Sequence, residues 1–173
     1  MSKIKFGTDG WRAIIAHDYT VDNVSRVSIA VAKWLLINYK QPKVVIGHDC
    51  RFGGELFAET VAKVLSSFSI DVILAKGFVS TPMVSLGVVK EKASLGIVIT
   101  ASHNPASYNG YKLKGDFGGP LLPKDISSVE DLIPEINNID LENINFLQLL
   151  NDEKVRYVDL ETMYCKHVKE NFD

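Results

Sequence analysis

The stretch LGIVITASHNP, residues 95–105, joins five apolar residues to a polar loop that closes with an Asn-Pro pair. Short apolar runs rich in β-branched residues are typical of strands covered on both faces of a sheet. An Asn-Pro pair favours a turn directly after such a strand. The stretch therefore predicts a buried strand over 95–99, which presents hydroxyl and imidazole side chains on a loop at its carboxyl end.

The residues before this stretch alternate between helical and strand patterns. Apolar residues at helical spacing predict helices, and short β-branched runs between them predict strands. Thr20 is suited to cap the first helix, and Pro82 after Thr81 is suited to begin the third. In chain order the predicted elements are a helix over 20–40, a strand over 43–47, a helix over 54–68, a strand over 71–75 and a helix over 81–93. This alternation predicts an α/β fold: a three-layer α/β/α sandwich around a mainly parallel, mixed sheet.

The residues after the stretch divide into three segments. A Gly-rich, hairpin-like segment begins at Asn109 and precedes an acidic amphipathic helix near 123–137, so we predict one α/β/α domain over 1–137. Residues 138–157 are polar with isolated Leu and Ile, and they predict a linker. Residues 158–173 predict a helix capped by Asp159 that begins a second, truncated domain.

Composition narrows the class of protein. Of 173 residues 46% are hydrophobic, and 19 Lys and Arg against 21 Asp and Glu leave a net charge of -2. This balance provides no electrostatic footprint for nucleic acid or an anionic membrane, so we expect neither as a partner. No apolar run approaches the length of a membrane helix or a signal peptide core. Cys50 and Cys165 have no metal-like spacing and are predicted to be unpaired, as expected in the cytoplasm.

The carboxyl ends of parallel strands lie at one edge of a sheet, where ligands gather. In the loop after 95–99, Ser102 is a candidate nucleophile or phosphoryl carrier, and His103 is a candidate proton-transfer group. Lys112, at the end of NGYK, is a cation suited to phosphate. The alternative is a turn of solvated polar residues without a chemical role. A hydrolase triad is disfavoured because neighbouring side chains diverge and no G-x-S-x-G motif is present.

Two further motifs belong to the predicted edge. FGTDGWR, residues 6–12, combines a Gly-rich turn, whose backbone N–H groups can face an anion, with the guanidinium of Arg12. The alternative is an N-terminal turn with Arg12 in a structural ion pair. In GHDCR, residues 47–51, Asp49 and Arg51 are expected to pair and support the site, with direct ligand contact by Arg51 as the alternative.

Together FGTDGWR, VVIGHDCRF and TASHNP with its downstream NGYK resemble the N-terminal domain of the α-D-phosphohexomutases, the phosphoglucomutase and phosphomannomutase superfamily. The resemblance covers residues 4–126 in the same order. It implies the first α/β/α domain of a four-domain enzyme. Such an enzyme interconverts the 1-phosphate and 6-phosphate of glucose or mannose through a hexose 1,6-bisphosphate, which acts as intermediate and activator.

The resemblance also implies residue roles. Ser102 is the phosphoserine, and its phosphate is a ligand of the cofactor Mg²⁺. Arg12 and Lys112 bind substrate and stabilise charge, and His103 or Lys112 moves the proton. The remaining implied residues are Thr100 and Asn104 as substrate contacts, and Asp49 and Arg51 as structural support.

The resemblance further implies what this chain does not contain. The other Mg²⁺ ligands belong to a D-G-D-x-D loop of a second domain, which has no counterpart here. We therefore expect domains II to IV of the same protein as partners, and an exposed face prone to self-association. Phosphoglucosamine mutases usually have Ile at the position of Trp11, so an amino-sugar phosphate is the alternative substrate. A non-catalytic module that binds a sugar phosphate or a protein, and a serine hydrolase, are the alternatives outside the family's activity.

Overall fold

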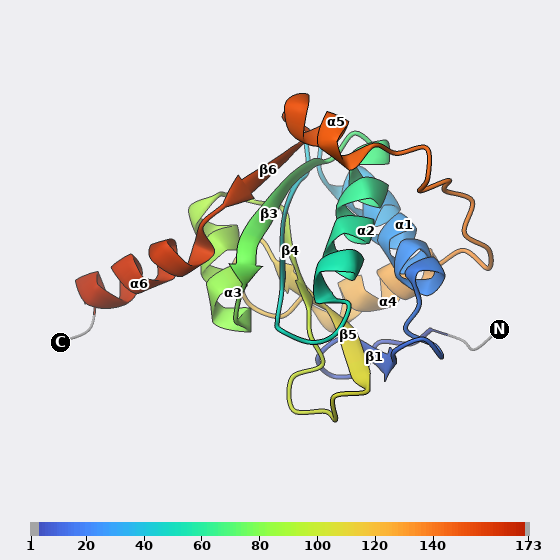
Figure 1. The fold of residues 1–173 in the computed structure, drawn as a ribbon, viewed down its shortest axis with the longest axis horizontal. Helices are drawn as coiled ribbons and strands as arrows, with labels where there is room; N and C mark the ends of the chain where they lie inside the picture. The colour runs from blue at the N-terminus through green and yellow to red at the C-terminus, as the bar shows by residue number, and fades with distance from the viewer. Residues whose placement is uncertain (1–3, 172–173) are drawn as a thin grey trace.

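Six strands form one mixed sheet in the computed structural model, which describes residues 4–171 (Figure 1). Across the sheet their order is β1-β5-β4-β2-β3-β6. β5 runs antiparallel to β1 and β4, whereas β2 is parallel to β4 and β3, and β3 is parallel to β6. The strands are β1 Trp11–Ile14, β2 Lys43–His48, β3 Asp71–Phe78, β4 Leu95–Ile99, β5 Tyr108–Gly115 and β6 Val155–Val158.

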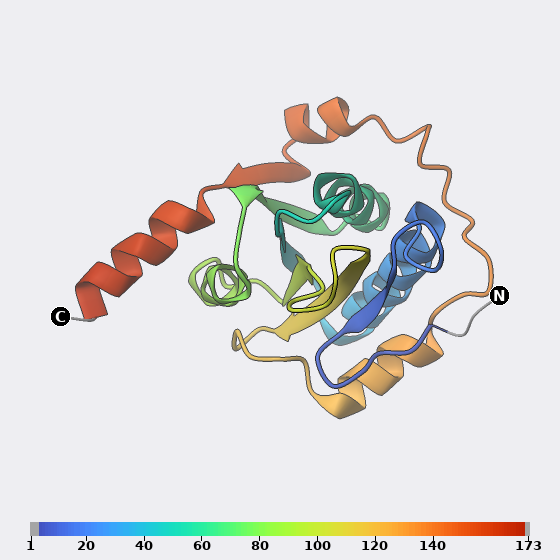
Figure 2. The ribbon, with the colours of Figure 1, turned by 60° about the horizontal axis from the view of Figure 1, so that its bottom comes forward.

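Helices cover both faces of this sheet. Figure 2 shows α1, α2 and α4 on one side and α3 on the other. The helices are α1 Val21–Asn38, α2 Gly54–Ser67, α3 Thr81–Lys90, α4 Pro123–Asp131, α5 Phe146–Asn151 and α6 Leu160–Asn171. The three-layer α/β/α sandwich with a mainly parallel, mixed sheet is therefore confirmed.

The apolar pattern of the sequence explains the two layers of core. The predicted stripe of α1 is fully buried against the sheet, and Thr20 caps the helix by accepting a hydrogen bond from the backbone N–H of Asn23. A smaller cluster lies between the sheet and α3, and it includes Val45, Val84 and Val98. Burying a Val or Leu side chain is worth about 1.5–3 kcal/mol, so these two clusters stabilise both faces of the sheet.

Several predicted boundaries differ from the structure. The acidic helix α4 ends at Asp131 and not near residue 137, because Pro134 lacks an N–H and disfavours helical backbone before it. β3 continues to Phe78, beyond the predicted end at residue 75. α3 ends at Lys90 and takes Ser80 as its N-cap residue, so Thr81 is already helical.

The segment 138–157, predicted as a linker, contains the short helix α5 and the strand β6. β6 pairs in parallel with β3, and Val155 opposite Val72 is buried in the larger core cluster. β6 has only four residues, and just one of them is fully buried. So short a strand has too few alternating positions to be recognised without its partner.

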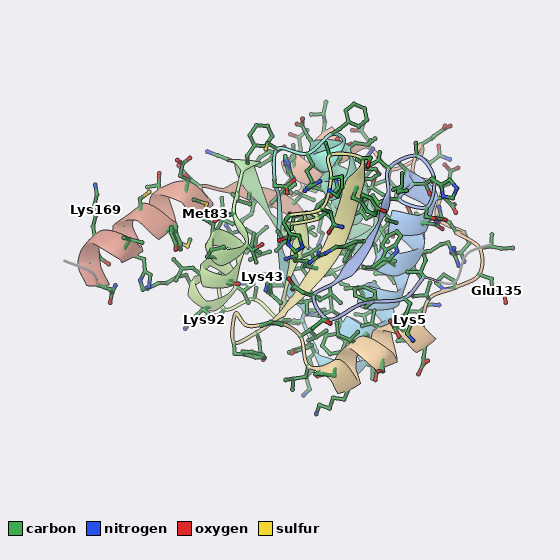
Figure 3. All side chains as sticks on the ribbon, turned by 90° about the horizontal axis from the view of Figure 1, so that it is seen from below. Lys5, Lys43, Met83, Lys92, Glu135 and Lys169 are labelled. Carbon is green, nitrogen blue, oxygen red and sulfur yellow. The ribbon has the colours of Figure 1, made fainter. Side chains whose placement is uncertain are left out.

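The last helix, α6, extends away from the sheet (Figure 1). Asp159 caps it as predicted, accepting hydrogen bonds from the backbone N–H and the hydroxyl of Thr162. Leu160 is the one residue of α6 that is fully buried, and it packs in the cluster beneath α3. Figure 3 shows Lys169 near the outer end of this helix, away from the rest of the molecule.

Candidate functional site

The loops that follow β2 and β4 lie side by side, and Arg51 joins them. Its two terminal nitrogens donate hydrogen bonds to four backbone carbonyls of the second loop, those of Ser102, Asn104, Pro105 and Tyr108, at 2.6–3.0 Å. Its Nε lies 3.5 Å from Oδ2 of Asp49. A guanidinium has five N–H donors, so the four hydrogen bonds use those of the two terminal nitrogens, and Nε faces the Asp49 carboxylate. Arg51 therefore holds the loop and has no donor left for a ligand.

Asp49 extends the same support to the backbone of Ser102. Its Oδ1 accepts the backbone N–H of Arg51 at 3.0 Å, and its Oδ2 accepts the hydroxyl of Thr100 at 2.5 Å. The Thr100 oxygen in turn accepts the backbone N–H of Ser102 at 3.0 Å. Thr100, expected as a substrate contact, thus has its hydroxyl engaged on both sides within the protein.

Ser102 has a left-handed backbone, with φ of 57°, and its side chain is exposed. For a residue with a Cβ this conformation costs about 1–2 kcal/mol. The hydrogen bonds of its N–H to Thr100 and of its carbonyl to Arg51 offset that cost. The loop therefore fixes the backbone of Ser102 from both sides and leaves the hydroxyl open to solvent.

Arg12, on β1, reaches the same loop from the other side. Its Nη1 donates to Oδ1 of Asn104 at 2.8 Å, and its Nη2 lies 3.7 Å from Oδ2 of Asp9. The oxygen of Asn104, another expected substrate contact, is thus engaged by Arg12, which leaves its amide nitrogen for a ligand. These contacts bring Arg12, Asn104 and Ser102 to one edge of the sheet.

Lys112 lies on β5 and is almost completely buried. Its Nζ donates to Oδ2 of Asp9 at 2.5 Å. The turn that carries Asp9 lies directly on β5 because Gly10 has a φ of 99°, and a Cβ there would lie 2.7 Å from the carbonyl oxygen of Tyr111. Only glycine adopts that conformation at little cost. The FGTDGWR turn thus places a carboxylate on the lysine of NGYK.

Asp9 and Lys114 were not among the predicted site residues. Partial burial raises the pKa of Asp9, but the hydrogen bond from Lys112 and the charges of Lys112, Lys114 and Arg12 outweigh it and lower the pKa. Burial lowers the pKa of Lys114, and nearby Asp9 raises it while Lys112 lowers it further. One carboxylate therefore serves three cations, an excess of positive charge that suits an anion. The sequence signal for Lys114 is its spacing of two from Lys112, which places both on one face of β5.

A shallow cavity of about 400 Å³ lies beside this cluster. The Gly-rich turn and Arg12 line it, together with Lys5. Backbone N–H groups of such turns favour anions, so the cavity adds space for a phosphorylated ligand next to the cations. The residues that line it are Lys5, Gly7, Thr8, Asp9, Gly10 and Arg12.

The remaining candidates divide into exposed and buried groups. His103 is exposed and makes no hydrogen bond or ion pair with other described residues, so its ring is available to a ligand. His17 contacts Asp18, and His167 contacts Asn171, as surface residues do. Cys50 and Cys165 are exposed and unpaired, as predicted. Within residues 4–171, no three His, Cys, Asp or Glu side chains are grouped so that they could hold a metal ion, and no helix is long and apolar enough to cross a membrane.

Comparison with known proteins places this geometry in a family. Residues 3–140 match the family model described as phosphoglucomutase/phosphomannomutase, alpha/beta/alpha domain I. A phosphoglucomutase of Staphylococcus saprophyticus is 33% identical over 172 residues, which are 96% of this chain and 31% of that protein. A probable phosphoglucosamine mutase of Methanosphaera stadtmanae is 35% identical over 156 residues, 89% of this chain and 34% of that protein.

Solved structures agree with this match. A putative phosphomannomutase from Thermus thermophilus superposes with a TM-score of 0.88 at 33% identity, over 99% of this chain and 37% of that one. Parafusin, a phosphoglucomutase from Paramecium, has a TM-score of 0.79 at 18% identity, which shows the fold alone. The chain spans about a third of the length of these curated relatives. The motifs, the sandwich and these matches agree, and the chain belongs to the phosphoglucomutase/phosphomannomutase family as its α/β/α domain I.

Proposed function

We propose that Ser102 accepts and returns a phosphoryl group in a hexose-phosphate mutase that interconverts 1-phosphate and 6-phosphate. The observation that carries this proposal is the way hydrogen bonds fix the backbone of Ser102. Its backbone is fixed by Thr100 and Arg51 while its hydroxyl is exposed on the same edge as Arg12. A phosphoryl carrier needs such positioning, because transfer requires the attacking and leaving oxygens to lie in line with phosphorus.

The chemistry has two matched half-reactions. The Ser102 oxygen attacks one phosphorus of a hexose 1,6-bisphosphate, and the new Oγ–P bond forms as the bond from phosphorus to the sugar oxygen breaks. The serine proton ends on the released sugar oxygen, so a hexose monophosphate leaves. In the reverse direction the sugar hydroxyl attacks phosphoserine and restores the serine. Transfer at different sugar positions in the two directions interconverts the monophosphates.

The cations and His103 have separate roles in this proposal. Arg12 and Lys112 stabilise the charge on the transferring phosphoryl group. Lys112 is held by Asp9 and Arg12 by Asn104, so both cations are positioned before the ligand arrives. His103, exposed beside Ser102, is the candidate proton carrier, with Lys112 as the alternative.

Mg²⁺ belongs to the proposal only for the longer protein. The described residues 4–171 include no cluster of metal-ligating side chains, so these residues do not form the site by themselves and we derive no step through the ion. A phosphoryl group on Ser102 would contribute its oxygens as ligands. The remaining ligands and the sugar contacts are assigned to the domains that the longer relatives carry. The unpaired Cys50 and Cys165 support a cytoplasmic location.

The sugar is the less specified part of the proposal. Glucose and mannose phosphates are the proposed substrates. A phosphoglucosamine mutase is the second candidate, because several relatives at 33–38% identity carry that name. A non-catalytic module that binds sugar phosphate is the alternative if the chain accepts no phosphoryl group.

The test is the intact mass of the chain before and after incubation with glucose 1,6-bisphosphate and Mg²⁺. We expect a gain of one phosphoryl group that is lost in Ser102→Ala and kept in Ser107→Ala, a matched change at an exposed serine of the same loop. A gain that survives Ser102→Ala contradicts the assignment. If the unmodified chain gains no phosphoryl group, this chain by itself is a binding module, and phosphoryl transfer requires the other domains. Glucosamine 1,6-bisphosphate in a parallel reaction tests the second candidate.

A further inference from the structure

A second cavity, of about 200 Å³, lies between α2 and β3. Its remaining walls come from His48 at the end of β2, Phe146 of α5 and Tyr157 of β6. In Figure 1, α2, β3, β6 and α5 surround this part of the molecule. The volume corresponds to about six or seven water molecules, the size of a single small ring. None of the residues assigned above to phosphoryl transfer lines it.

The charged residues that line this cavity are all acidic. Glu55 and Glu59 of α2 line it, and no Lys or Arg does. Glu59 is paired with Lys63 at 2.9 Å, whereas Glu55 has no hydrogen bond or ion pair with the described residues. The cavity therefore carries one carboxylate without a side-chain partner, in the first turn of α2. An anionic ligand is disfavoured there, in contrast to the cluster at Arg12 and Lys112.

His48 adds an acceptor to the cavity. The residue is only 7% exposed, and its Nδ1 lies 3.0 Å from the backbone carbonyl of Asp49. A carbonyl only accepts, so we assign the proton of the neutral ring to Nδ1, which leaves Nε2 as an acceptor. Nε2 has no hydrogen-bond partner among the described residues. It is not sealed from solvent either, because Oγ of Ser66 is the one side-chain polar atom of the described residues that is both buried and without a partner. Nε2 is therefore accessible from solvent, and His48 is one of the residues that line the cavity.

Aromatic rings form the apolar part of the wall. Phe78 is 67% exposed and contacts the His48 ring edge to face, with centroids 5.7 Å apart. Tyr157 and Phe146 line the cavity as well. A cation near the face of Phe or Tyr is attracted by the ring quadrupole. Carboxylate, imidazole acceptor and aromatic wall together favour a ligand that has N–H donors, a positive charge and an apolar body.

We propose that this cavity binds a small organic ammonium ion of about one ring in size. The ammonium group donates hydrogen bonds to Glu55 and to Nε2 of His48, and its carbon body packs on Phe78 and Tyr157. This site is separate from the proposed phosphoryl transfer, so either proposal can fail without the other.

The test is an NMR titration of the chain with cyclohexylammonium chloride and, separately, with cyclohexanol. The two probes have the same ring and differ in charge and N–H donors. We expect saturable shifts of the His48 and Phe78 ring signals with cyclohexylammonium, at a Kd at least tenfold lower than that for cyclohexanol. Equal affinity for the two probes, or shifts that rise without saturation, would overturn the proposal.

Two variants and one control locate the binding. Glu55→Gln is expected to weaken cyclohexylammonium binding about tenfold, since it removes the negative charge that lacks a side-chain partner and keeps the size of an exposed side chain. Glu142→Gln, an exposed carboxylate outside the cavity, is the matched control and is expected to change nothing. Equal weakening by both variants would show general attraction to surface charge and contradict the proposal. Tyr157→Leu, at the edge strand, is expected to weaken binding to a smaller extent.

Discussion

Arg51 and Arg156 belong to regions of the molecule that are held in different ways. Arg51 lies in the site edge, by which we mean the turn 7–10, Arg12 and the loops 49–51 and 100–108. Its side chain is 13% exposed and joins both loops. Arg156 lies in the C-terminal arm, residues 155–171, is 47% exposed and makes one ion pair, with Glu91 at 2.5 Å. Arg51 fixes the conformation of a loop, whereas Arg156 makes one ion pair on the surface.

The difference extends to the rest of each region. In the site edge, polar side chains bond to backbone groups of segments far apart in sequence, so removing one leaves several groups unpaired. In the C-terminal arm, Leu160 is the residue of α6 that is buried in the smaller core cluster. It fits there because Gly87 of α3 has no side chain. A Cβ at Gly87 would lie 2.7 Å from a Leu160 methyl group. The site edge is thus fixed by side-chain hydrogen bonds, whereas the arm is attached by the pairing of β6 with β3 and by the apolar contacts of Val155 and Leu160.

The largest expected effect comes from removing each arginine. Arg51→Met should lower the free energy of unfolding by about 4 kcal/mol, because four carbonyls and Asp49 lose their partner. Arg156→Met should cost less than about 1 kcal/mol, as expected for an exposed ion pair. Urea unfolding of the two variants measures both. Losses of similar size would erase the distinction between the regions.

A smaller effect is expected in the arm. Leu160→Ala should cost about 3 kcal/mol in the interactions that attach α6, because it empties a fully buried site. Amide hydrogen exchange should accelerate along α6 while the protection of β2 and β4 stays unchanged. Met163→Ala, at a partly buried position of the same helix, is the control and should have less effect. If β2 also loses protection, the arm is part of the main folding unit.

The smallest effect concerns the titration of Asp9. Its pKa is lowered from 3.8, so the stability it contributes is present above pH 3.8 and lost as the pH falls through the lower, folded-state pKa. Carboxyl NMR should give an Asp9 midpoint below 3.8, and Lys112→Met should raise it. Lys166→Met, which removes the exposed pair with Glu170 on α6, should leave it unchanged. An Asp9 midpoint that is the same in Lys112→Met would contradict the proposed interaction between Asp9 of the turn and Lys112 of β5.

Much of this architecture follows from local pattern. The buried stripe of α1 and the five apolar residues of β4 are visible in the sequence, and Leu95–Ile99 forms a strand with the predicted bounds. The motifs likewise place Ser102, Arg12 and Lys112 near one edge. What the pattern lacks is the partner of each polar group. Nothing local shows that Asp9 meets Lys112, 103 residues away, or that β6 adds to β3.

The expected contacts of Thr100 and Asn104 illustrate the same limit. Both are polar residues of a loop beside a candidate nucleophile, which suits a ligand contact. In the structure the Thr100 hydroxyl and the Asn104 oxygen are engaged by Asp49, Ser102 and Arg12. The sequence indicates which polar residues lie at the edge of the sheet. Hydrogen bonds to other side chains decide which of these polar groups remain available to a ligand.

At Ser102 the backbone conformation favours glycine, whereas the proposed chemistry requires the serine hydroxyl. At a φ of 57° glycine would fit better than any residue with a Cβ, and the gain would be about 1 kcal/mol. An engineer who screened this domain for heat resistance would therefore select glycine at position 102 and discard the hydroxyl unknowingly. A screen for robustness here selects against the group that gives the loop its proposed purpose.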